Sequence, residues 1–255
     1  MLDNLSVVVI CKNAASTIGP TLESVREFAE VVVYDNGSTD ETIRIAEQYQ
    51  NVSVHSGSFE GFGKTKQKAT GLAKHDWVFS LDADESVSPE LLDELKTWSP
   101  DSASTVGVVL RRNRFMGVHV RHGSWANDWI VRLFNRTSHS FNANLVHESV
   151  ETGNQTQKLR LSGAIDHNAV QDIGQFLRKI DHYSEIRRNE SSETFHPAVI
   201  FFRAIGAFIK SYFVHLGFLD GWRGLVIAWN DANGTFYKYI KRYADRVEQD
   251  KSQAK

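Results

Sequence analysis

Hydrophobic and polar positions alternate with two different spacings over the first part of the chain. Short apolar runs, rich in β-branched residues and typical of buried strands, lie at 7–10, 31–34, 52–55 and 77–81. Apolar residues at helical spacing separate these runs and predict helices at 16–28, 38–49, 64–74 and 89–98. Ser38 and Glu41 have the spacing of a capping box for the second helix. The alternation predicts an α/β fold in which helices cover both faces of a mostly parallel sheet.

The pattern changes after about residue 100. Strand patterns then follow one another without long helices between them, at 106–112, 130–135, 144–151 and 158–165. Such a succession predicts mixed or antiparallel pairing. Helical spacing dominates from Asp172 onward, and the charged end predicts a solvated helix. We therefore expect one domain over 1–168, with halves at 1–100 and 101–168, and a helical C-terminal region over 169–255.

The helical region contains an apolar and aromatic stretch at 198–219. Arg203, Lys210 and His215 interrupt this stretch, whereas a membrane-spanning helix needs about 20 mostly apolar residues with few charges. Two interpretations remain open. The stretch either packs against the domain or lies in the interface of a membrane.

Composition is that of an ordinary globular protein. Of 255 residues, 41% are hydrophobic and 24% are charged, which allows a substantial core. The net charge of -2 gives no indication of a nucleic-acid partner. Cys11 is the one cysteine, so it cannot form an internal disulfide. Its apolar surroundings predict a buried core residue in a reducing compartment.

Acidic residues follow two of the predicted strands. Asp82 and Asp84 end the fourth apolar run, and Asp35 ends the second. Strand residues alternate in direction, so Asp82 and Asp84 can point to one side and hold Mg²⁺ or Mn²⁺ together with substrate phosphates. The acids could instead cap the next helix, although Ser88 followed by proline is the better cap. Ligands of parallel sheets bind beyond the carboxyl ends of the strands, where we expect Asp35 and Asp82 to meet.

The order of these motifs resembles the family 2 glycosyltransferases of the GT-A fold. The shared elements are Val9-Ile10-Cys11-Lys12-Asn13, Asp35-Asn36-Gly37-Ser38-Thr39-Asp40 and Asp82-Ala83-Asp84. Ala14 and Ala15 stand where that family often has an acidic residue. The resemblance implies a Rossmann-like GT-A fold with a mixed, mostly parallel sheet, flanking helices and a helical C-terminal region.

Later elements are similar to one subgroup, the lipopolysaccharide-core β-glucosyltransferases. These elements are Gly61-Phe62-Gly63-Lys64-Thr65-Lys66-Gln67, Asp128, Arg132-Leu133-Phe134, Val146-His147-Glu148 and Gly217-Phe218-Leu219-Asp220-Gly221. Gln67 replaces an asparagine of that subgroup. The resemblance covers nearly the whole chain.

The resemblance implies a nucleotide-sugar site formed by Asn13, Asp35, Lys66 and Asp82. Asp35 would accept a hydrogen bond from the uracil imide N–H. Asp82 would contact the ribose or the water shell of a metal, and Lys66 would offer a positive charge to the ribose-diphosphate region. Each residue also has a structural alternative: Asp35 as a helix cap, Asn13 as a turn residue and Lys66 as a solvated surface lysine.

The resemblance also assigns metal and catalytic roles. Asp84 would bind Mg²⁺ or Mn²⁺, and His167 would be a further ligand unless it is a structural histidine. Glu148 would be the general base of an inverting transfer, with Asp128 as the alternative. In a strand, His147 and Glu148 would point to opposite faces, so only one of them would enter the site. Glu148 could also be a strand-edge carboxylate without a catalytic role.

Arginines and tryptophans cluster in the middle region. Arg112, Arg132 and Trp125 would bind a phosphorylated glycolipid acceptor, or they are solvated charges and a core tryptophan. The resemblance implies transfer of a sugar, glucose in this subgroup, from a UDP-sugar to a lipid-linked oligosaccharide such as the lipopolysaccharide inner core. Such an enzyme would be cytoplasmic and peripheral to the inner face of the cytoplasmic membrane.

Two other functions fit parts of the pattern. A sugar nucleotidyltransferase would need a glycine-rich basic loop after the first strand, which residues 11–15 do not provide. A non-catalytic carbohydrate-binding protein on the same fold would lack the metal pair or the base, whereas Asp82, Asp84 and Glu148 are all present.

Overall fold

The computed structural model describes residues 2–144, 148–188 and 193–253. The chain divides into two compact units. The first contains Met1–Arg112 and Asn127–His167, and the second contains Asn113–Ala126 and Asn168–Lys255. Each unit is described by itself.

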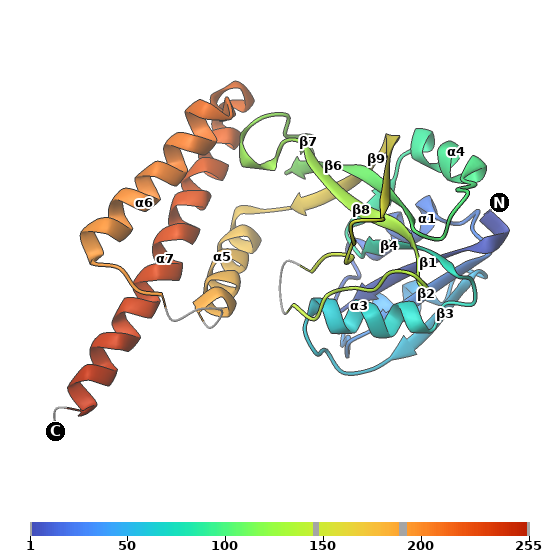
Figure 1. Ribbon diagram of the computed structural model, residues 1–255, viewed down its shortest axis with the longest axis horizontal. Helices are drawn as coiled ribbons and strands as arrows, with labels where there is room; N and C mark the ends of the chain where they lie inside the picture. The colour runs from blue at the N-terminus through green and yellow to red at the C-terminus, as the bar shows by residue number, and fades with distance from the viewer. Residues whose placement is uncertain (1, 145–147, 189–192, 254–255) are drawn as a thin grey trace. The chain divides into compact units, whose positions relative to one another are not determined.

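A mixed sheet forms the centre of the first unit (Figure 1). Its strands follow the order β3-β2-β1-β4-β8-β6-β9-β5. The strands are β1 Leu5–Cys11, β2 Glu30–Asp35, β3 Val52–Ser56, β4 Trp77–Asp82, β5 Glu85–Val87, β6 Thr105–Phe115, β8 Asp128–Asn135 and β9 Gln157–Val170. The first four are parallel, whereas β8 pairs antiparallel with β4 and β6, and β5 with β9. The predicted change of architecture after the fourth strand is confirmed, and so is the predicted fold class.

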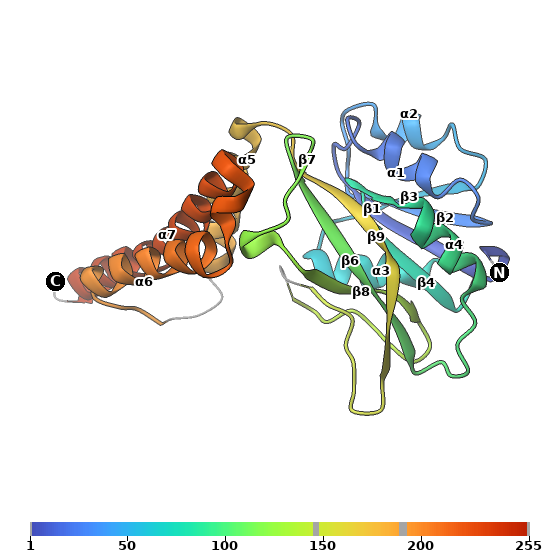
Figure 2. The same ribbon diagram turned by 90° about the horizontal axis from the view of Figure 1, so that it is seen from above.

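Helices cover both faces of this sheet (Figure 2). On one face, α1 Ile18–Ser24, α2 Thr42–Ala46 and α4 Pro89–Thr97 share a core cluster with alternate residues of β1, β2 and β4. On the other face, α3 Phe62–Gly71 contributes Ala69 to a second cluster that contains the remaining strand residues. A parallel strand buried on both faces reads as a continuous apolar run, which explains why these runs predicted strands correctly.

The predicted N-terminal cap is confirmed for one helix and wrong for another. The Ser88 hydroxyl accepts the Leu91 N–H at the start of α4, as predicted. The predicted capping box of α2 is wrong, because Glu41 is the N-cap residue and makes no side-chain cap hydrogen bond. The Ser38 hydroxyl donates instead to Asp35.

The predicted strand at 144–151 is also wrong in its described part. Residues 148 and 149 have no regular structure, 145–147 lie outside the described residues, and one isolated bridge joins Phe141 to Val150. The backbone of this segment bonds elsewhere, because Asn144 accepts the Gly63 N–H at the start of α3. A Cβ at Gly63 would lie 1.9 Å from the Asn142 carbonyl oxygen, so this close approach requires glycine.

The second unit is mostly helical. It contains β7 Val118–His119, α5 Ile173–Arg188, α6 Pro197–Ile209, a π-helical turn at Lys210–Val214 and the long helix α7 Gly221–Gln253. In both views α6 lies alongside α7. The segment Asn113–Ala126 joins these helices because Phe115 and Val120 pack with Phe176 and Ile227. The strand pattern gave no indication of this grouping.

Asp220, from the late glycine-containing motif, has a structural role in the second unit. Its Oδ2 accepts the backbone N–H of Arg121 at 3.0 Å and that of His122 at 2.7 Å. The His122 Nδ1 lies 3.2 Å from the other oxygen of Asp220. The carboxylate therefore fixes the segment Asn113–Ala126 to the start of α7.

Candidate functional site

Asp35 and Asp82 end two strands that flank β1. The register pairs Cys11 with Asp35 and Ile10 with Asp82, so both acids lie at the same sheet edge, about 10 Å apart across two strand spacings. Cys11 and Ile10 belong to opposite core clusters. The two carboxylates therefore leave the sheet on opposite faces, so the expectation that Asp35 and Asp82 meet is wrong.

Asp35 is held by its own loop. The side chain is buried, and Oδ2 accepts the backbone N–H groups of Gly37 and Ser38, both at 3.0 Å. It does not cap α2. Burial, and then the negative charge of Asp35, raise the pKa of the Cys11 thiol to about 12, so Cys11 is an un-ionised core thiol. Base recognition by Asp35 stays a prediction.

Asn13 joins the loops after β1 and β2. Its φ of 51° is left-handed, and its side-chain oxygen accepts the Thr39 N–H at 2.8 Å. Its own N–H donates to the Ser38 hydroxyl at 2.8 Å. Asn13 thus connects two loops and shapes the one that carries Asp35, and its part in donor binding stays a prediction.

On the Asp82 side, acids and bases alternate in a continuous set of ion pairs. Lys66 Nζ lies 2.6 Å from both Glu148 and Asp82, and Arg132 lies 2.7 Å from Asp82. Glu85 is 2.5 Å from Arg132 and 3.4 Å from Arg111, which in turn contacts Asp128 at 2.7 Å. We call this set the charge network; its members are Glu148, Lys66, Asp82, Arg132, Glu85, Arg111 and Asp128.

Lys66 is the most unexpected member of the charge network. The side chain is 1% exposed although it belongs to α3, whose neighbouring lysines are exposed. It passes over the ring of Phe141, with Nζ 5.8 Å from the ring centroid. The alternative of a solvated surface lysine is therefore wrong. A buried ammonium requires opposite charges, and Asp82 and Glu148 supply them.

The charge network keeps Asp82 ionised. Removal from water acts to raise the pKa of this carboxyl, but the charges of Arg132 and Lys66 outweigh that effect and hold its pKa well below the ordinary value. Its partner Arg132 has a raised pKa: desolvation opposes the shift, and the charges of Asp82 and Glu85 overcome it. Asp82 is thus ionised at neutral pH at the end of β4.

Asp84 and His167 approach each other from two elements. Asp84 lies in the turn between β4 and β5, and the register of β5 with β9 pairs Glu85 with His167. The Asp84 carboxylate is 3.5 Å from His167 Nε2. This pair fits a Mn²⁺ or Mg²⁺ ion that takes its remaining ligands from phosphate and water. No group of three or more His, Cys, Asp or Glu residues with metal-binding geometry occurs among the described residues.

The two candidate bases lie at opposite ends of the charge network. Glu148 is 17% exposed and bonds to Lys66, and Asp128 is 26% exposed and bonds to Arg111. Glu148 does not lie in a strand, so the prediction that strand geometry turns it away from His147 is wrong. His147 is outside the described residues.

The three predicted acceptor residues have different surroundings. Arg132 is buried between Asp82 and Glu85, which corrects the prediction that it binds an acceptor. Arg112 is 32% exposed and contacts Asp166 at 3.1 Å. Trp125 belongs to the second unit, where its ring packs against Phe115 and Phe176. For Arg112 and Trp125 the acceptor role stays a prediction.

Glu85 and Arg111 were not among the predicted site residues. Glu85 is completely buried, accepts the Asp82 N–H at 2.9 Å and bonds to two arginines. It therefore fixes the turn that carries Asp84. A glutamate directly after Asp-x-Asp was the only sequence signal for this role, and its arginine partners come from β6 and β8, far along the chain.

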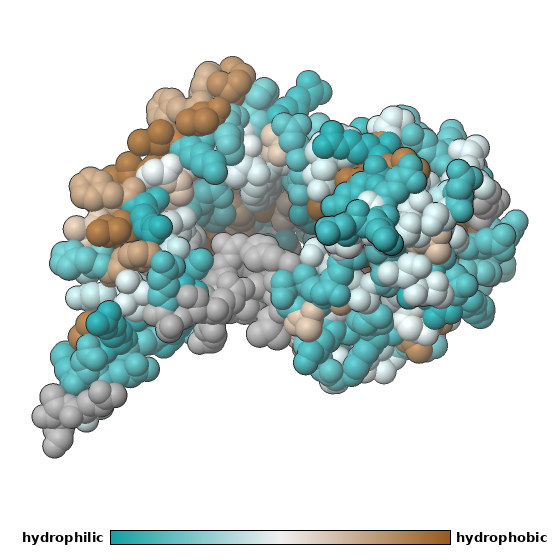
Figure 3. Space-filling model, viewed as in Figure 1, coloured by the Kyte–Doolittle hydropathy of each residue, from teal (hydrophilic) through white to brown (hydrophobic). Residues whose placement is uncertain are grey.

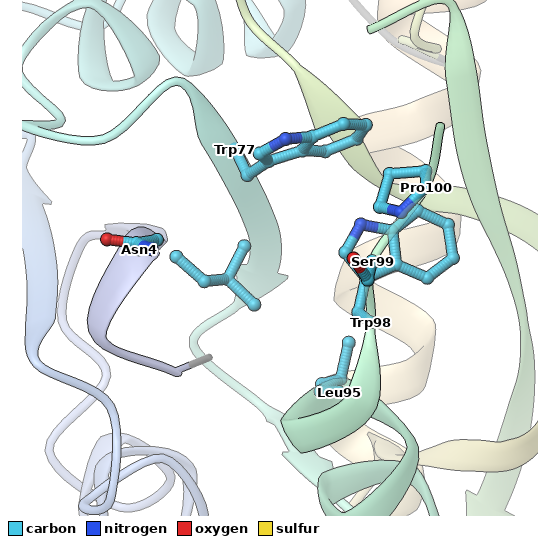
Figure 4. A pocket seen from close by; sticks show the side chains of 7 residues that line it. Asn4, Trp77, Leu95, Trp98, Ser99 and Pro100 are labelled. Atoms are coloured by element: carbon cyan, nitrogen blue, oxygen red, sulfur yellow. The ribbon is translucent and has the colours of Figure 1, made fainter. Parts of the chain in front are cut away.

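A cavity of about 290 Å³ lies elsewhere, at the amino ends of β1 and β4 (Figure 4). Trp77, Trp98 and Leu95 line it together with Asn4, Leu5, Ser99 and Pro100. Asp82 ends β4, so this cavity is at the other sheet edge and takes no part in the candidate site.

Comparison with known sequences gives a consistent picture. The sequence profile described as glycosyl transferase family 2 matches residues 6–153. An uncharacterized glycosyltransferase of Rickettsia felis is 25% identical over 265 residues, covering 94% of this chain and 89% of that protein. LpsC of Rhizobium meliloti, a lipopolysaccharide core biosynthesis glycosyltransferase, is 26% identical over 250 residues, covering 94% of this chain and 92% of that protein.

Among solved structures, residues 1–349 of TarS from S. aureus align with a TM-score of 0.48 and 16% sequence identity. The alignment covers 91% of this chain and 72% of the TarS chain.

Proposed function

Because this chain belongs to glycosyl transferase family 2, we propose that it transfers a sugar from a UDP-sugar to a hydroxyl group of a lipid-linked oligosaccharide, with inversion at the anomeric carbon. The observation that carries this proposal is the arrangement around Asp82. Lys66 joins that carboxylate to Glu148, and the pair of Asp84 and His167 follows within the next turn and strand. One lysine thus joins the proposed base to a proposed donor-binding acid, and the proposed metal ligands lie in the adjacent turn and strand.

Asn13, Asp35, Lys66 and Asp82 are the proposed donor-binding residues. The loops that carry Asn13 and Asp35 are joined by hydrogen bonds, which gives a fixed surface for a nucleoside at the sheet edge. Asp82 is ionised and oriented by two cations. Lys66 is buried between Asp82 and Glu148, so its proposed part in donor binding is to hold the Asp82 carboxylate in place.

Asp84 and His167 are the proposed metal ligands. A Mg²⁺ or Mn²⁺ ion held there would neutralise charge on the leaving nucleoside diphosphate. The chain's own contribution is geometric, because the buried Glu85 bonds to the backbone of Asp82 and so fixes the position of the turn.

Glu148 is the proposed general base, and Asp128 is the second candidate. In an inverting transfer, the carboxylate takes the proton of the acceptor hydroxyl while that oxygen attacks the anomeric carbon. The bond from that carbon to the diphosphate oxygen breaks on the opposite face, through a transition state of oxocarbenium character. Lys66 orients the Glu148 carboxylate at 2.6 Å.

The acceptor and the donor sugar rest on relatives. The name of the Rhizobium meliloti relative, which aligns over 94% of this chain, refers to lipopolysaccharide core biosynthesis. This supports a lipid-linked core oligosaccharide as the acceptor, in the cytoplasm at the membrane. The resemblance to the β-glucosyltransferase subgroup supports UDP-glucose as the donor.

Substitution of Asp84 tests the donor and metal site. We expect Asp84→Ala to abolish Mn²⁺-dependent binding of UDP, because it removes one of two protein ligands. Isothermal titration with UDP, with and without Mn²⁺, measures this directly. Asp93→Ala, at an exposed acid on α4, is the matched control and should bind UDP like the wild type. Metal-dependent binding that survives in Asp84→Ala would refute the assignment.

Substitution of Glu148 tests the base. We expect Glu148→Gln to retain UDP binding and to slow sugar transfer on the order of a hundredfold or more, because the amide cannot accept the proton. UDP release from UDP-glucose, measured with and without acceptor, gives the rate. If the rate is unchanged while Asp128→Asn is slow, the base is Asp128. If pyrophosphate is released from UTP and a sugar phosphate, the chain is a nucleotidyltransferase.

A further inference from the structure

The second unit exposes a large apolar and aromatic surface on α6 and the start of α7. Figure 3 shows these side chains as brown atoms over α6. We call this surface the apolar face; its exposed side chains are Val199, Phe201, Phe202, Ile205, Ile209, Phe213, Val214, Leu216, Phe218, Leu219, Trp222, Leu225 and Trp229. Phe202 is 69% exposed and Trp229 is 61% exposed. Apolar patches of this kind mark an interaction surface in most soluble proteins.

Packing within the unit does not account for the apolar face. The inward side of this segment is formed by Ile200, Ala204 and Ser211, which are buried, and α6 packs on α7. The stretch Pro197–Val214 is long and apolar enough to span a membrane by length and composition, yet only 17% of it is buried. The interpretation that this stretch is an ordinary packed helix is therefore wrong for its outward side.

In the α6 part of the apolar face the charges have one sign. Between Glu193 and Asp220 the sequence has no acidic residue, whereas Arg203 and Lys210 are both present and exposed. Arg223 lies over the Trp222 ring at 4.7 Å. Long basic side chains beside exposed aromatic rings are typical of surfaces that meet phospholipid headgroups.

We propose that the apolar face docks the protein on a bilayer that contains anionic phospholipids. Its phenylalanine and tryptophan side chains enter the headgroup region, and Arg203 and Lys210 contact lipid phosphates. This inference deepens the proposed function and rests on it for its purpose, because a lipid-linked acceptor is itself held in a bilayer.

Two other occupants fit the apolar face less well. In a symmetric dimer the face would meet its own copy, which would bring Arg203 and Lys210 near their equivalents without an acidic partner from the face. A span across the membrane would carry Arg203 and Lys210 into the hydrocarbon layer, where charged side chains are costly. The chain then turns at Leu216 and Gly221, which both have positive φ.

Vesicle flotation of the full chain tests the docking surface. We expect the wild type to float with vesicles of phosphatidylglycerol and phosphatidylethanolamine, and to bind phosphatidylcholine vesicles at least about tenfold more weakly. The double variant Phe202→Gln, Trp229→Gln should bind anionic vesicles on the order of a hundredfold more weakly, because each ring is withdrawn from the interface. Lys210→Glu should weaken binding to the anionic vesicles by about tenfold.

Leu177→Gln is the matched control, since Leu177 is 58% exposed in the same unit but lies on α5. It should bind vesicles like the wild type. Equal binding by the double variant and the wild type would overturn the proposal. Wild-type protein that stays in the membrane on carbonate extraction would also overturn the proposal, because it would indicate a membrane span. A dimer that forms without vesicles and is abolished in the double variant would overturn it as well.

The same proteins separate this inference from the proposed function. UDP release from UDP-glucose in vesicle-free buffer should be equal in the wild type and the double variant, because both substitutions lie outside the charge network. Vesicle binding without UDP release would leave the docking surface standing and refute the transferase proposal. UDP release without vesicle binding would support the transferase proposal and refute the docking surface.

Discussion

Lys66 shows how much a single side chain depends on residues that are distant in sequence. Lys64 and Lys68 on the same helix are exposed, whereas Lys66 is buried between Asp82 and Glu148. A buried cation is stable only with paired anions, and removal of one partner leaves an uncompensated charge. The charge network is therefore a structural unit as well as the proposed site, and its members should respond to substitution together.

Asp82 makes the stability that the charge network contributes to the folded protein depend on pH. Its pKa in the folded protein is well below the ordinary value of 3.8, so its ionised form favours the folded state. The contribution is complete above about pH 4, and it declines as the pH falls from there toward the lower folded-state pKa. We expect Asp82→Asn to lower the free energy of unfolding at pH 7 on the order of 3 kcal/mol. The difference from the wild type should shrink below pH 4.

Urea unfolding from pH 7 to pH 3 measures this difference. Asp101→Asn, at an exposed residue outside the charge network, corrects for the loss of one carboxylate. A difference between Asp82→Asn and the wild type that stays constant down to pH 3 would contradict the depressed pKa.

At the scale of elements, the short strand β5 places Asp84 beside His167. Only three residues long, it is held by its register with β9 and by the burial of Glu85. Helix α4 then packs on β9, where Glu94 accepts the backbone N–H groups of Ser162 at 2.9 Å and Gly163 at 2.8 Å. The position of Asp84 and His167, the proposed metal ligands, thus depends on how closely α4 and β9 approach.

Gly163 is the point of closest approach between α4 and β9. A Cβ there would lie 2.3 Å from the backbone of Leu91, which cannot move without shifting α4. We expect Gly163→Ala to destabilise the protein by about 1–3 kcal/mol and to weaken Mn²⁺-dependent UDP binding. Denaturant unfolding and titration with UDP measure the two effects.

Gly153→Ala is the matched control for that substitution, since a Cβ at Gly153 meets nothing within 4 Å. It should leave stability and binding almost unchanged. Equal stability of the two variants would show that α4 adjusts freely, and the proposed dependence of the metal pair on this contact would fail.

At the scale of the whole molecule, the chain enters the second unit twice. It visits that unit briefly, returns to the first unit, and then ends in the second. Asn113–Ala126 is an excursion from the sheet into the helical unit, where Phe115 is completely buried. Phe79 has the same burial in the core of the first unit. These two phenylalanines therefore report separately on the two cores.

We expect calorimetry to resolve two unfolding transitions that respond to different substitutions. Phe115→Ala should destabilise the helical unit by about 3–5 kcal/mol. It should lower the transition temperature of that unit only. Phe79→Ala is the matched control. It should destabilise the first unit by a similar free energy and lower the transition temperature of that unit only. If each substitution lowers both transitions equally, the two units unfold as one.

The sequence by itself determined the four parallel strands, most helices, the α/β class and the family. Buried parallel strands are continuous apolar runs, and Asp-x-Asp and the Asp35 motif are contiguous, so local patterns contain this information. The family resemblance named Asp84 and His167 together as proposed metal ligands, and the structure places them 3.5 Å apart.

Only the tertiary structure decided how the charges are paired and which surfaces are exposed. Burial of Lys66, the role of Glu85 and the membership of Phe115 in the helical core depend on contacts between residues many positions apart. Strand alternation fixed the direction of Asp35 and Asp82 only once the register with β1 was known. An apolar run has the same sequence pattern whether it is buried or exposed, so the outward side of α6 could be identified only from its neighbours.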